Sequence, residues 1–278
     1  MTVLTAARRS ETATKGTVPL TRQGRLMRGA VGTIAIVILV EVLIRTDVVD
    51  SSYFPAPSTV LVRTGELLLD PDFLSDVGST LIAAVIGLIL AALIAIPLGI
   101  ALGSFRYAYA GARSIVEMLR PIPSVALVPL AILLFGGSLG MKVSLIVYAA
   151  VWPILFNAIY GAHDVDKLAI ETARSFGMKR GKILLRVTLP HAAPFIATGV
   201  RISAAIALVL AITAEFLGGG RDGLGKWLLE SQLAGSRVDL MFAGILVAGV
   251  LGVALSASLS FIEGRLFPWY RLRYGRTA

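Results

Sequence analysis

Apolar residues in this chain gather into long continuous runs and do not alternate with polar ones. No charged residue lies between Asp76 and Arg106, and none lies between Asp239 and Glu263. A helix crosses a bilayer core about 30 Å thick with roughly 20 apolar residues, so each run is long enough to span a membrane. Continuous apolar runs favour spanning helices over a barrel of alternating strands.

The same pattern predicts an all-α integral membrane protein with six transmembrane helices. Residues 28–267 are expected to form the transmembrane domain, between a disordered basic tail at 1–27 and a short tail at 268–278. The polar N-terminal segment and the lack of a cleavage pattern after the first apolar run indicate an uncleaved span. The expected spans are Arg28–Ile44, Gly78–Gly103, Ser114–Phe135, Lys142–Tyr160, Pro194–Leu217 and Leu240–Ile262.

Composition and charge agree with this fold class. The 278 residues are 56% hydrophobic and 15% charged, whereas soluble domains are about 45–50% apolar and about a quarter charged. The net charge of +9 fits basic loops on the cytoplasmic face better than nucleic-acid binding. With the N-terminus inside, the inner segments hold 20 of the 26 Lys and Arg residues. This bias predicts that both termini are cytoplasmic.

Two local patterns add detail to the spans. The outer stretch after the first span is expected to carry a short amphipathic helix. Small residues recur at helical spacing at Gly99 and Gly103, and again at Gly244, Ala248 and Gly252. Such stripes allow helix backbones to approach closely, either within one subunit or between two.

The inner loop at residues 161–190 has a pattern of its own. Asp164 and Asp166 favour a helix start, Leu168–Phe176 is a good helix, and Gly177 is expected to stop it. Pro190 is expected to end a second short helix. Ala169, Ala173 and Gly177 recur every four residues. These features alone fit either a lever presented to another protein or an ordinary basic loop.

This loop resembles the EAA loop of binding-protein-dependent ABC permeases. The matching residues are Glu171, Ala173, Gly177, Ile183, Leu189 and Pro190, and Thr172 stands where Ala is commoner. Residues 121–130, residues 152–157 with Gly161, and Glu215 with the turn at 223–225 are similar to the taurine, sulfonate and nitrate branch. The stretch Phe135-Gly136-Gly137-Ser138 departs from it, because relatives more often have Ile after the first glycine.

The resemblance implies a type I importer permease (MetI-like) fold in a bacterial inner membrane. Two permease copies, expected as a homodimer, would form the path for an aliphatic sulfonate, taurine or nitrate-like solute that a binding protein delivers. The alternative solute is a heteroaromatic compound or thiamine precursor. Two cytosolic ATPase subunits would dock on the EAA helix, the coupling helix. The expected coupling residues are Glu171, Thr172, Ala173, Gly177, Leu189 and Pro190.

No phosphate-binding loop of the form G-x-x-x-x-G-K-[ST] is present. Gly181-Lys182 is followed by Ile183, and Gly225-Lys226 by Trp227, so neither supplies the hydroxyl that binds Mg²⁺. The chain is therefore predicted to be a transport subunit with no catalytic residues, cofactor or metal of its own. ATP and Mg²⁺ are expected on the partner ATPase.

Candidate pathway-lining residues are Pro123, Ser124, Asn157 and Glu215. A charge near the bilayer centre costs roughly 2.5–3.5 kcal/mol, so Glu215 should face protein or water. It either lines a cavity or lies near the outer interface, bonded to the Gly218–Gly220 backbone. Asn157 either lines the path or bonds a neighbouring helix. Six spans and lone carboxylates argue against an ion-coupled secondary transporter. The spans also contain no paired acids or His clusters, which a membrane-embedded enzyme would require.

Overall fold

A computed structural model describes residues 22–218, 220–235 and 237–268 of the chain. Every regular element within those ranges is helical, which confirms the predicted all-α class. The chain divides into two units, residues 1–51 and residues 52–278. Each unit is described by itself.

The first unit contains helix α1 (Arg22–Arg45). Its segment Met27–Arg45 is long and apolar enough to cross a membrane, as predicted for the first span. Near the end of α1, Arg45 Nε lies 2.6 Å from Glu41 Oε1, one helical turn away. A carboxylate in an apolar helix is thereby paired within its own helix.

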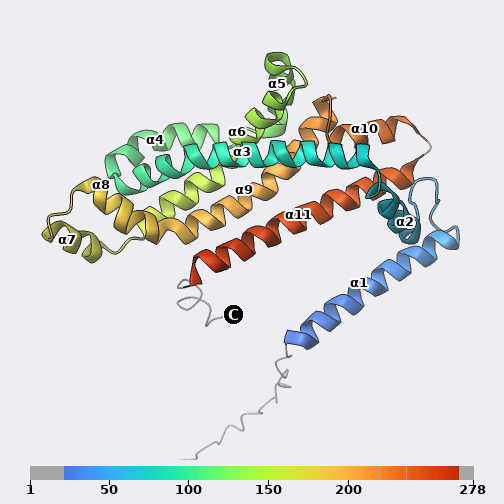
Figure 1. Cartoon of the computed structure of the whole chain (residues 1–278), viewed down its shortest axis with the longest axis horizontal. Coiled ribbons are helices and arrows are strands. Elements are labelled where there is room, and N and C mark those ends of the chain that lie inside the picture. The colour runs from blue at the N-terminus through green and yellow to red at the C-terminus, as the bar shows by residue number, and fades with distance from the viewer. Residues whose placement is uncertain (1–21, 219, 236, 269–278) are drawn as a thin grey trace, which may run out of the picture. The chain divides into compact units, whose positions relative to one another are not determined.

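The second unit is built around three mutually packed helices (Figure 1). These are α3 (Pro71–Ser104), α6 (Leu139–His163) and α9 (Leu189–Gly218), with α11 (Val238–Leu266) packed on α9. Helix α2 (Pro57–Leu67) packs on α11 and is the short helix expected after the first span. Helix α10 (Leu224–Leu233) packs on α9 and α11.

The third predicted span, Ser114–Phe135, is not one continuous helix. The chain forms α4 (Arg106–Leu119), a short 3₁₀ helix η1 (Ser124–Leu127) and α5 (Val128–Phe135), with a bend of 75° between the two halves. Pro121 and Pro123 fall at the bend, where a proline nitrogen cannot continue a helix ladder. The described residues thus hold five straight candidate spans, or six if the bent pair counts as one.

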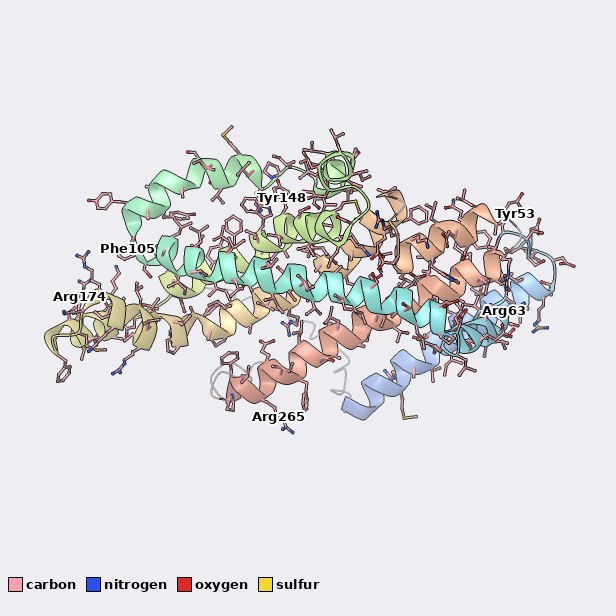
Figure 2. All side chains as sticks on the ribbon, turned by 45° about the horizontal axis from the view of Figure 1, so that its top comes forward. Tyr53, Arg63, Phe105, Tyr148, Arg174 and Arg265 are labelled. Atoms are coloured by element: carbon pink, nitrogen blue, oxygen red, sulfur yellow. The ribbon has the colours of Figure 1, made fainter. Side chains whose placement is uncertain are left out.

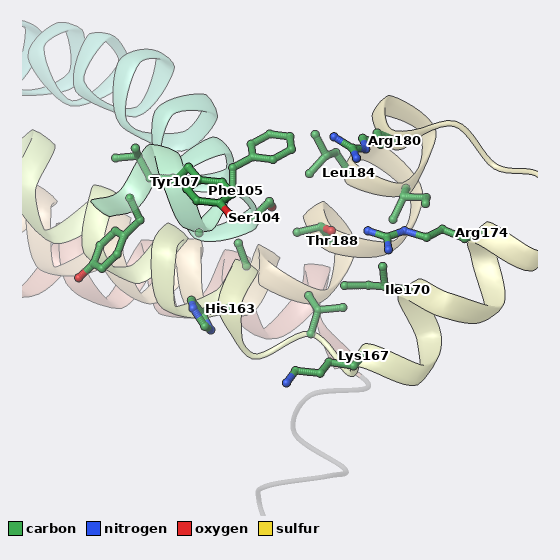
Figure 3. A pocket seen from close by; sticks show the side chains of 16 residues that line it. Ser104, Phe105, Tyr107, His163, Lys167, Ile170, Arg174, Arg180, Leu184 and Thr188 are labelled. Carbon is green, nitrogen blue, oxygen red and sulfur yellow. The ribbon is translucent and has the colours of Figure 1, made fainter. Parts of the chain in front are cut away.

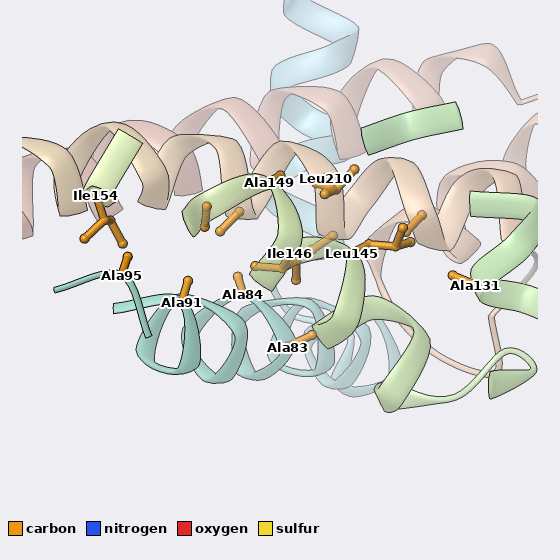
Figure 4. Close-up of a cluster of buried hydrophobic side chains, with 14 of the residues drawn as sticks. Ala83, Ala84, Ala91, Ala95, Ala131, Leu145, Ile146, Ala149, Ile154 and Leu210 are labelled. Atoms are coloured by element: carbon orange, nitrogen blue, oxygen red, sulfur yellow. The ribbon is translucent and has the colours of Figure 1, made fainter. Parts of the chain in front are cut away.

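Small residues bring the central helices together. Ala91 and Ala95 of α3 and Ala150 of α6 are fully buried in one core cluster. Figure 4 shows Ala91 and Ala95 with Ile146 and Leu210. A Cβ added at Gly99 would lie 2.5 Å from the Cβ of Ala158, so α3 and α6 meet there almost backbone to backbone. The stripe at Gly99 and Gly103 therefore packs within the subunit.

Large apolar side chains also stand on the outside of this unit (Figure 2). Leu93 of α3 is 66% exposed, and Val253 and Phe261 of α11 are 71% and 62% exposed. Exposed apolar surface on this scale is expected of helices that face lipid or a second membrane subunit.

Candidate functional site

The loop after α6 folds into a short capped helix. Helix α7 (Lys167–Ser175) starts at Asp166, whose carboxylate accepts a 2.8 Å hydrogen bond from the Leu168 amide. It ends at Gly177, which has a left-handed φ of +75°. The Gly177 and Met178 amides donate back to the carbonyls of Arg174 and Ala173, closing the last turn. The predicted helix and its glycine stop are confirmed.

The predicted coupling residues do not all face the same way. Glu171 and Thr172 are exposed on α7, whereas Ala173 is buried. Leu168 and Phe176 are the large apolar side chains that this helix leaves outside, at 67% and 83% exposure. The free surface of α7 thus combines a carboxylate, a hydroxyl and two apolar groups.

Pro190 does not end a helix, so that prediction was wrong. After α8 (Arg180–Ile183) the chain makes a π-helical turn, η2 (Leu184–Thr188), and runs directly into α9. The Leu189 amide bonds to the Leu184 carbonyl, five residues back. This wider turn accommodates the proline ring, which has no N–H to place in the ladder. Leu189 and Pro190 therefore lie in an unbroken path from α8 into the membrane helix.

At the opposite end of the bundle lies a buried ion pair that joins three helices. Lys142 Nζ of α6 lies 2.9 Å from Glu215 Oε1 of α9, and both side chains are almost completely buried. Glu215 Oε2 accepts hydrogen bonds from Thr80 Oγ1 of α3 at 2.8 Å and from the Gly225 amide at 3.0 Å. The carboxylate thus has a partner on each oxygen, as a buried charge requires.

The loop between α9 and α10 completes this cluster. Besides Glu215, Lys142 Nζ donates to the Asp222 carbonyl at 2.9 Å and to Ser79 Oγ at 3.1 Å, so all three ammonium N–H groups are used. Ser79 Oγ donates to Asp222 Oδ2 at 2.7 Å. This hydrogen bond and the nearby charge of Lys142 lower the pKa of Asp222.

Two features of the turn at 223–225 explain its glycines. The Gly223 amide donates to Asp76 Oδ1 at 2.7 Å, and Gly223 has a φ of +124°, outside the range of other residues. A side chain at Gly223 would meet the Glu215 carboxylate, and one at Gly225 would meet the Ile212 carbonyl. The glycines let the backbone close over the ion pair.

Sequence reasoning found Glu215 but missed its partner. In the sequence, Lys142 stands out only as the first residue of the fourth expected span. A usable signal was that alternating spans bring the start of the fourth and the end of the fifth to the same side of the membrane. Glu215 is buried among Lys142, Thr80 and Gly225, and the backbone amide that donates to its carboxylate belongs to Gly225, whereas the sequence alternative named Gly218–Gly220.

The other pathway candidates are not gathered around Glu215. Pro123 is exposed at the start of η1, and Ser124 is half-buried beside it. The Asn157 amide donates at 2.8 Å to the Pro153 carbonyl of its own helix. Neither a neighbouring helix nor Glu215 is the acceptor of that bond.

Comparison with known proteins identifies the family of this chain. Residues 95–272 match the family described as binding-protein-dependent transport system inner membrane component. The chain belongs to this family. The permease is thus the transport subunit of an ABC importer, ATP hydrolysis belongs to a separate chain, and the family implies ATPase and binding-protein partners.

Individual relatives place the permease more closely. It is 30% identical to the taurine transport system permease protein TauC of Escherichia coli, over 91% of this chain and 92% of that one. It is 28% identical to an aliphatic sulfonates transport permease protein of Bacillus subtilis, over 87% of each chain. The nitrate import permease protein NrtB of Synechocystis is also 28% identical, over 88% of this chain and 90% of NrtB. These relatives match the predicted taurine, sulfonate and nitrate branch.

A solved structure supports the predicted MetI-like fold. A chain of the MetNI methionine ABC transporter, crystallised in inward-facing conformations, superposes on the permease with a TM-score of 0.60 at 19% identity. The match covers 68% of the permease and 93% of that chain. At this identity the likeness shows the fold alone.

Proposed function

We propose that two copies of this permease form the membrane path of an importer for an aliphatic sulfonate, taurine or a nitrate-like anion. The names of the relatives support this solute class: TauC is named for taurine, the B. subtilis protein for aliphatic sulfonates and NrtB for nitrate. In this proposal a binding protein selects the solute, and the two ATPase subunits hold ATP and Mg²⁺. The permease itself holds neither a cofactor nor a metal.

The observation that carries the coupling part of this proposal is the connection from α7 into α9. A capped helix with exposed Glu171, Thr172, Leu168 and Phe176 leads through α8 and η2 into a helix that spans the bundle. From Arg180 onward, α8, η2 and α9 form one continuous helical element, and such an element passes a displacement along its length. Residues 176–179, which join α7 to it, are not helical. ATPase closure that moves α7 would therefore act on α9 through this short link, where the turn at Gly177 sets the direction of the chain, while Leu189 and Pro190 lie inside the continuous element.

The proposed topology has both termini in the cytoplasm of a bacterial cell, with α7 on that side and α2 outside. The chain has no cysteine, so single cysteines can be placed for labelling. Ser175→Cys on α7 is expected to react with a membrane-impermeant maleimide only in inside-out vesicles. Thr59→Cys on α2 is expected to react in right-side-out vesicles, and the reverse pattern would invert the topology.

The experiment that tests the function is reconstitution with the partner chains. The permease, its ATPase and its binding protein are placed in proteoliposomes, and ATP-dependent uptake of taurine, an alkanesulfonate and nitrate is measured. One of the three is expected to be taken up and to stimulate ATP hydrolysis. Stimulation by a thiamine-precursor pyrimidine alone would reassign the solute. Uptake without ATP would contradict the importer mechanism.

A further inference from the structure

A cavity of about 770 Å³ lies where the α7 and α8 segments approach the end of α3 and the start of α4 (Figure 3). It is at the opposite end of α3 from the Lys142–Glu215 pair. Neither the ion pair nor the predicted pathway residues are among the described residues that line it.

The charged residues of the lining are all basic. Lys167, Arg174 and Arg180 line the cavity together with the imidazole of His163, and no Asp or Glu is among the described lining residues. Figure 3 shows Arg174 of α7 and Arg180 of α8 reaching into the same space. Within the described residues, Lys167, Arg174 and Arg180 form no salt bridge with any carboxylate. Cations gathered without counter-charges favour an anion between them.

The remaining wall is part polar and part apolar. Ser104 Oγ is buried and has no hydrogen-bond partner within the described part of the chain. Thr188, almost fully buried, lines the same cavity. Phe105, Ile170 and Leu184 add apolar surface. The lining thus offers basic, hydroxyl and apolar surface. A ligand that contacts all three carries both an anionic group and an apolar part.

The position of the cavity relates it to the membrane surface. Helix α3 ends at Ser104, α6 ends at His163, and the candidate span 180–218 starts at Arg180. Ser104 and His163 lie within three residues of the predicted span ends at Gly103 and Tyr160, so this wall of the cavity is at the level of lipid headgroups. Arg180 lies 14 positions before the predicted start of the fifth span at Pro194, so the α8 wall is on the cytoplasmic side of that level. Basic pockets between spanning helices at this level bind anionic lipid headgroups.

We propose that this cavity binds a phosphate group, with Arg174 and Arg180 as its main ligands. The planar guanidinium group matches phosphate oxygens with two parallel N–H donors, so two of them can hold one phosphate from both sides. Ser104 supplies a further hydroxyl. Phe105, Ile170 and Leu184 lie where the start of an acyl chain would pack, so an anionic phospholipid fits the whole lining and free phosphate fits only its polar part.

The proposed ligand would connect α7 to the membrane domain. Among the helices α7 packs mainly against α8, while the cavity wall opposite α7 belongs to α3 and α4. A phosphate held by Arg174 on one side and Ser104 on the other would bridge that space. Occupancy is therefore expected to restrain the coupling helix, whichever solute the importer carries.

The test uses the purified complex of permease and ATPase in two kinds of nanodisc. One kind contains phosphatidylcholine, and the other contains equal parts of phosphatidylcholine and phosphatidylglycerol. Native mass spectrometry measures how much phosphatidylglycerol the complex retains. Arg174→Gln/Arg180→Gln is compared with Lys182→Gln/Arg186→Gln, which removes the same charge from exposed residues nearby that do not line the cavity.

Wild type and the Lys182/Arg186 variant are expected to retain phosphatidylglycerol at least about tenfold more strongly than the Arg174/Arg180 variant, because charge-assisted bonds are lost only in the latter. Amide exchange in α7 is expected to slow when the lipid is present. A parallel arm adds orthophosphate to phosphatidylcholine discs and measures the melting temperature. A rise seen only with Arg174 and Arg180 intact, without lipid retention, would assign free phosphate. If both double variants behave like wild type in both arms, the proposal is overturned.

Discussion

Lys142 and Glu215 form a 2.9 Å ion pair between α6 and α9 with exposures of only 1% and 0%. Removing two charges from water costs as much as, or more than, their attraction returns, so such a pair adds little net stability. Its importance lies in what happens when one partner is lost, because the other charge then remains buried without compensation. The pair thus specifies how α3, α6, α9 and the loop after α9 fit together.

Lys142→Met is expected to destabilise the permease by about 3–5 kcal/mol, because the Glu215 carboxyl group is then left buried without its counter-charge. Lys142→Met/Glu215→Leu is expected to recover most of that loss. Thermal unfolding of the purified complex, followed by size-exclusion chromatography, measures both effects.

The matched control for that experiment is an exposed pair of the same type. Lys226 and Glu230 lie 3.3 Å apart on α10 with exposures of 29% and 59%. Lys226→Met should change stability by less than about 1 kcal/mol, as for other surface pairs. If Lys142→Met is as mild as Lys226→Met, the buried pair does not have the role assigned to it.

Asp222 predicts a pH dependence at the same end of the bundle. The hydrogen bond from Ser79, followed by the charge of Lys142, holds its pKa below the ordinary value. A carboxylate with a lowered folded-state pKa stabilises the fold above its unfolded pKa, and this contribution disappears as the pH falls through the folded pKa. Wild type should therefore lose more stability on acidification below about pH 4 than Asp222→Asn does.

The size of that difference is limited, because the Asp222 side chain is 58% exposed and water screens its interactions. Melting temperatures of wild type and Asp222→Asn are compared across the acidic range, with Ser79→Ala as a second variant that removes the hydrogen bond but keeps the carboxyl. Parallel acid-induced losses in wild type and Asp222→Asn would contradict the prediction.

The parts of this structure that were predictable from sequence are those set by neighbouring residues. The start of α7 depends on Asp166 and its end on Gly177, and both lie within a few residues of the helix that they delimit. The apolar runs predicted the spans for the same reason, since each run contains its own information about length.

The missed features depend on residues far apart or on competing local preferences. Lys142 and Glu215 are separated by 73 positions, and no periodicity links them. Pro121 and Pro123 follow α4, but the 75° bend, which the sequence did not predict, also depends on packing, such as the Tyr148 hydroxyl donating to the Leu119 carbonyl. At Pro190 the ring disfavours a helix, yet the π turn before it lets the helix continue.

Gly99 and Gly78, both in α3, provide a matched pair of glycine substitutions. A Cβ at position 99 would lie 2.5 Å from the Ala158 Cβ and 2.9 Å from the Leu155 carbonyl, whereas a Cβ at position 78 meets nothing within 4 Å. Gly99→Ala is expected to destabilise the fold by about 1–3 kcal/mol through overpacking. Gly78→Ala should be neutral or stabilising by up to about 1 kcal/mol, because alanine favours helix. The melting temperatures of the two variants test this prediction. Equal changes in stability would mean that α3 and α6 are not in such close contact.

Gly177 is expected to matter for coupling more than for folding. Its φ of +75° is left-handed, and a Cβ there would meet nothing within 4 Å, so the cost of a substitution comes from the backbone alone. Gly177→Ala should cost roughly 1–2 kcal/mol, felt at the end of α7, and Gly177→Asn less, because asparagine tolerates this conformation.

Gly181 is an exposed neighbour without a positive φ and with equally open surroundings, so Gly181→Ala is the control. The complex is assayed for faster amide exchange in α7 and for ATP hydrolysis stimulated by the loaded binding protein. Gly177→Ala should reduce the stimulation severalfold while global melting stays close to wild type. Stimulation that is unchanged in both variants would show that the end of α7 need not keep this geometry for the ATPase to move the permease.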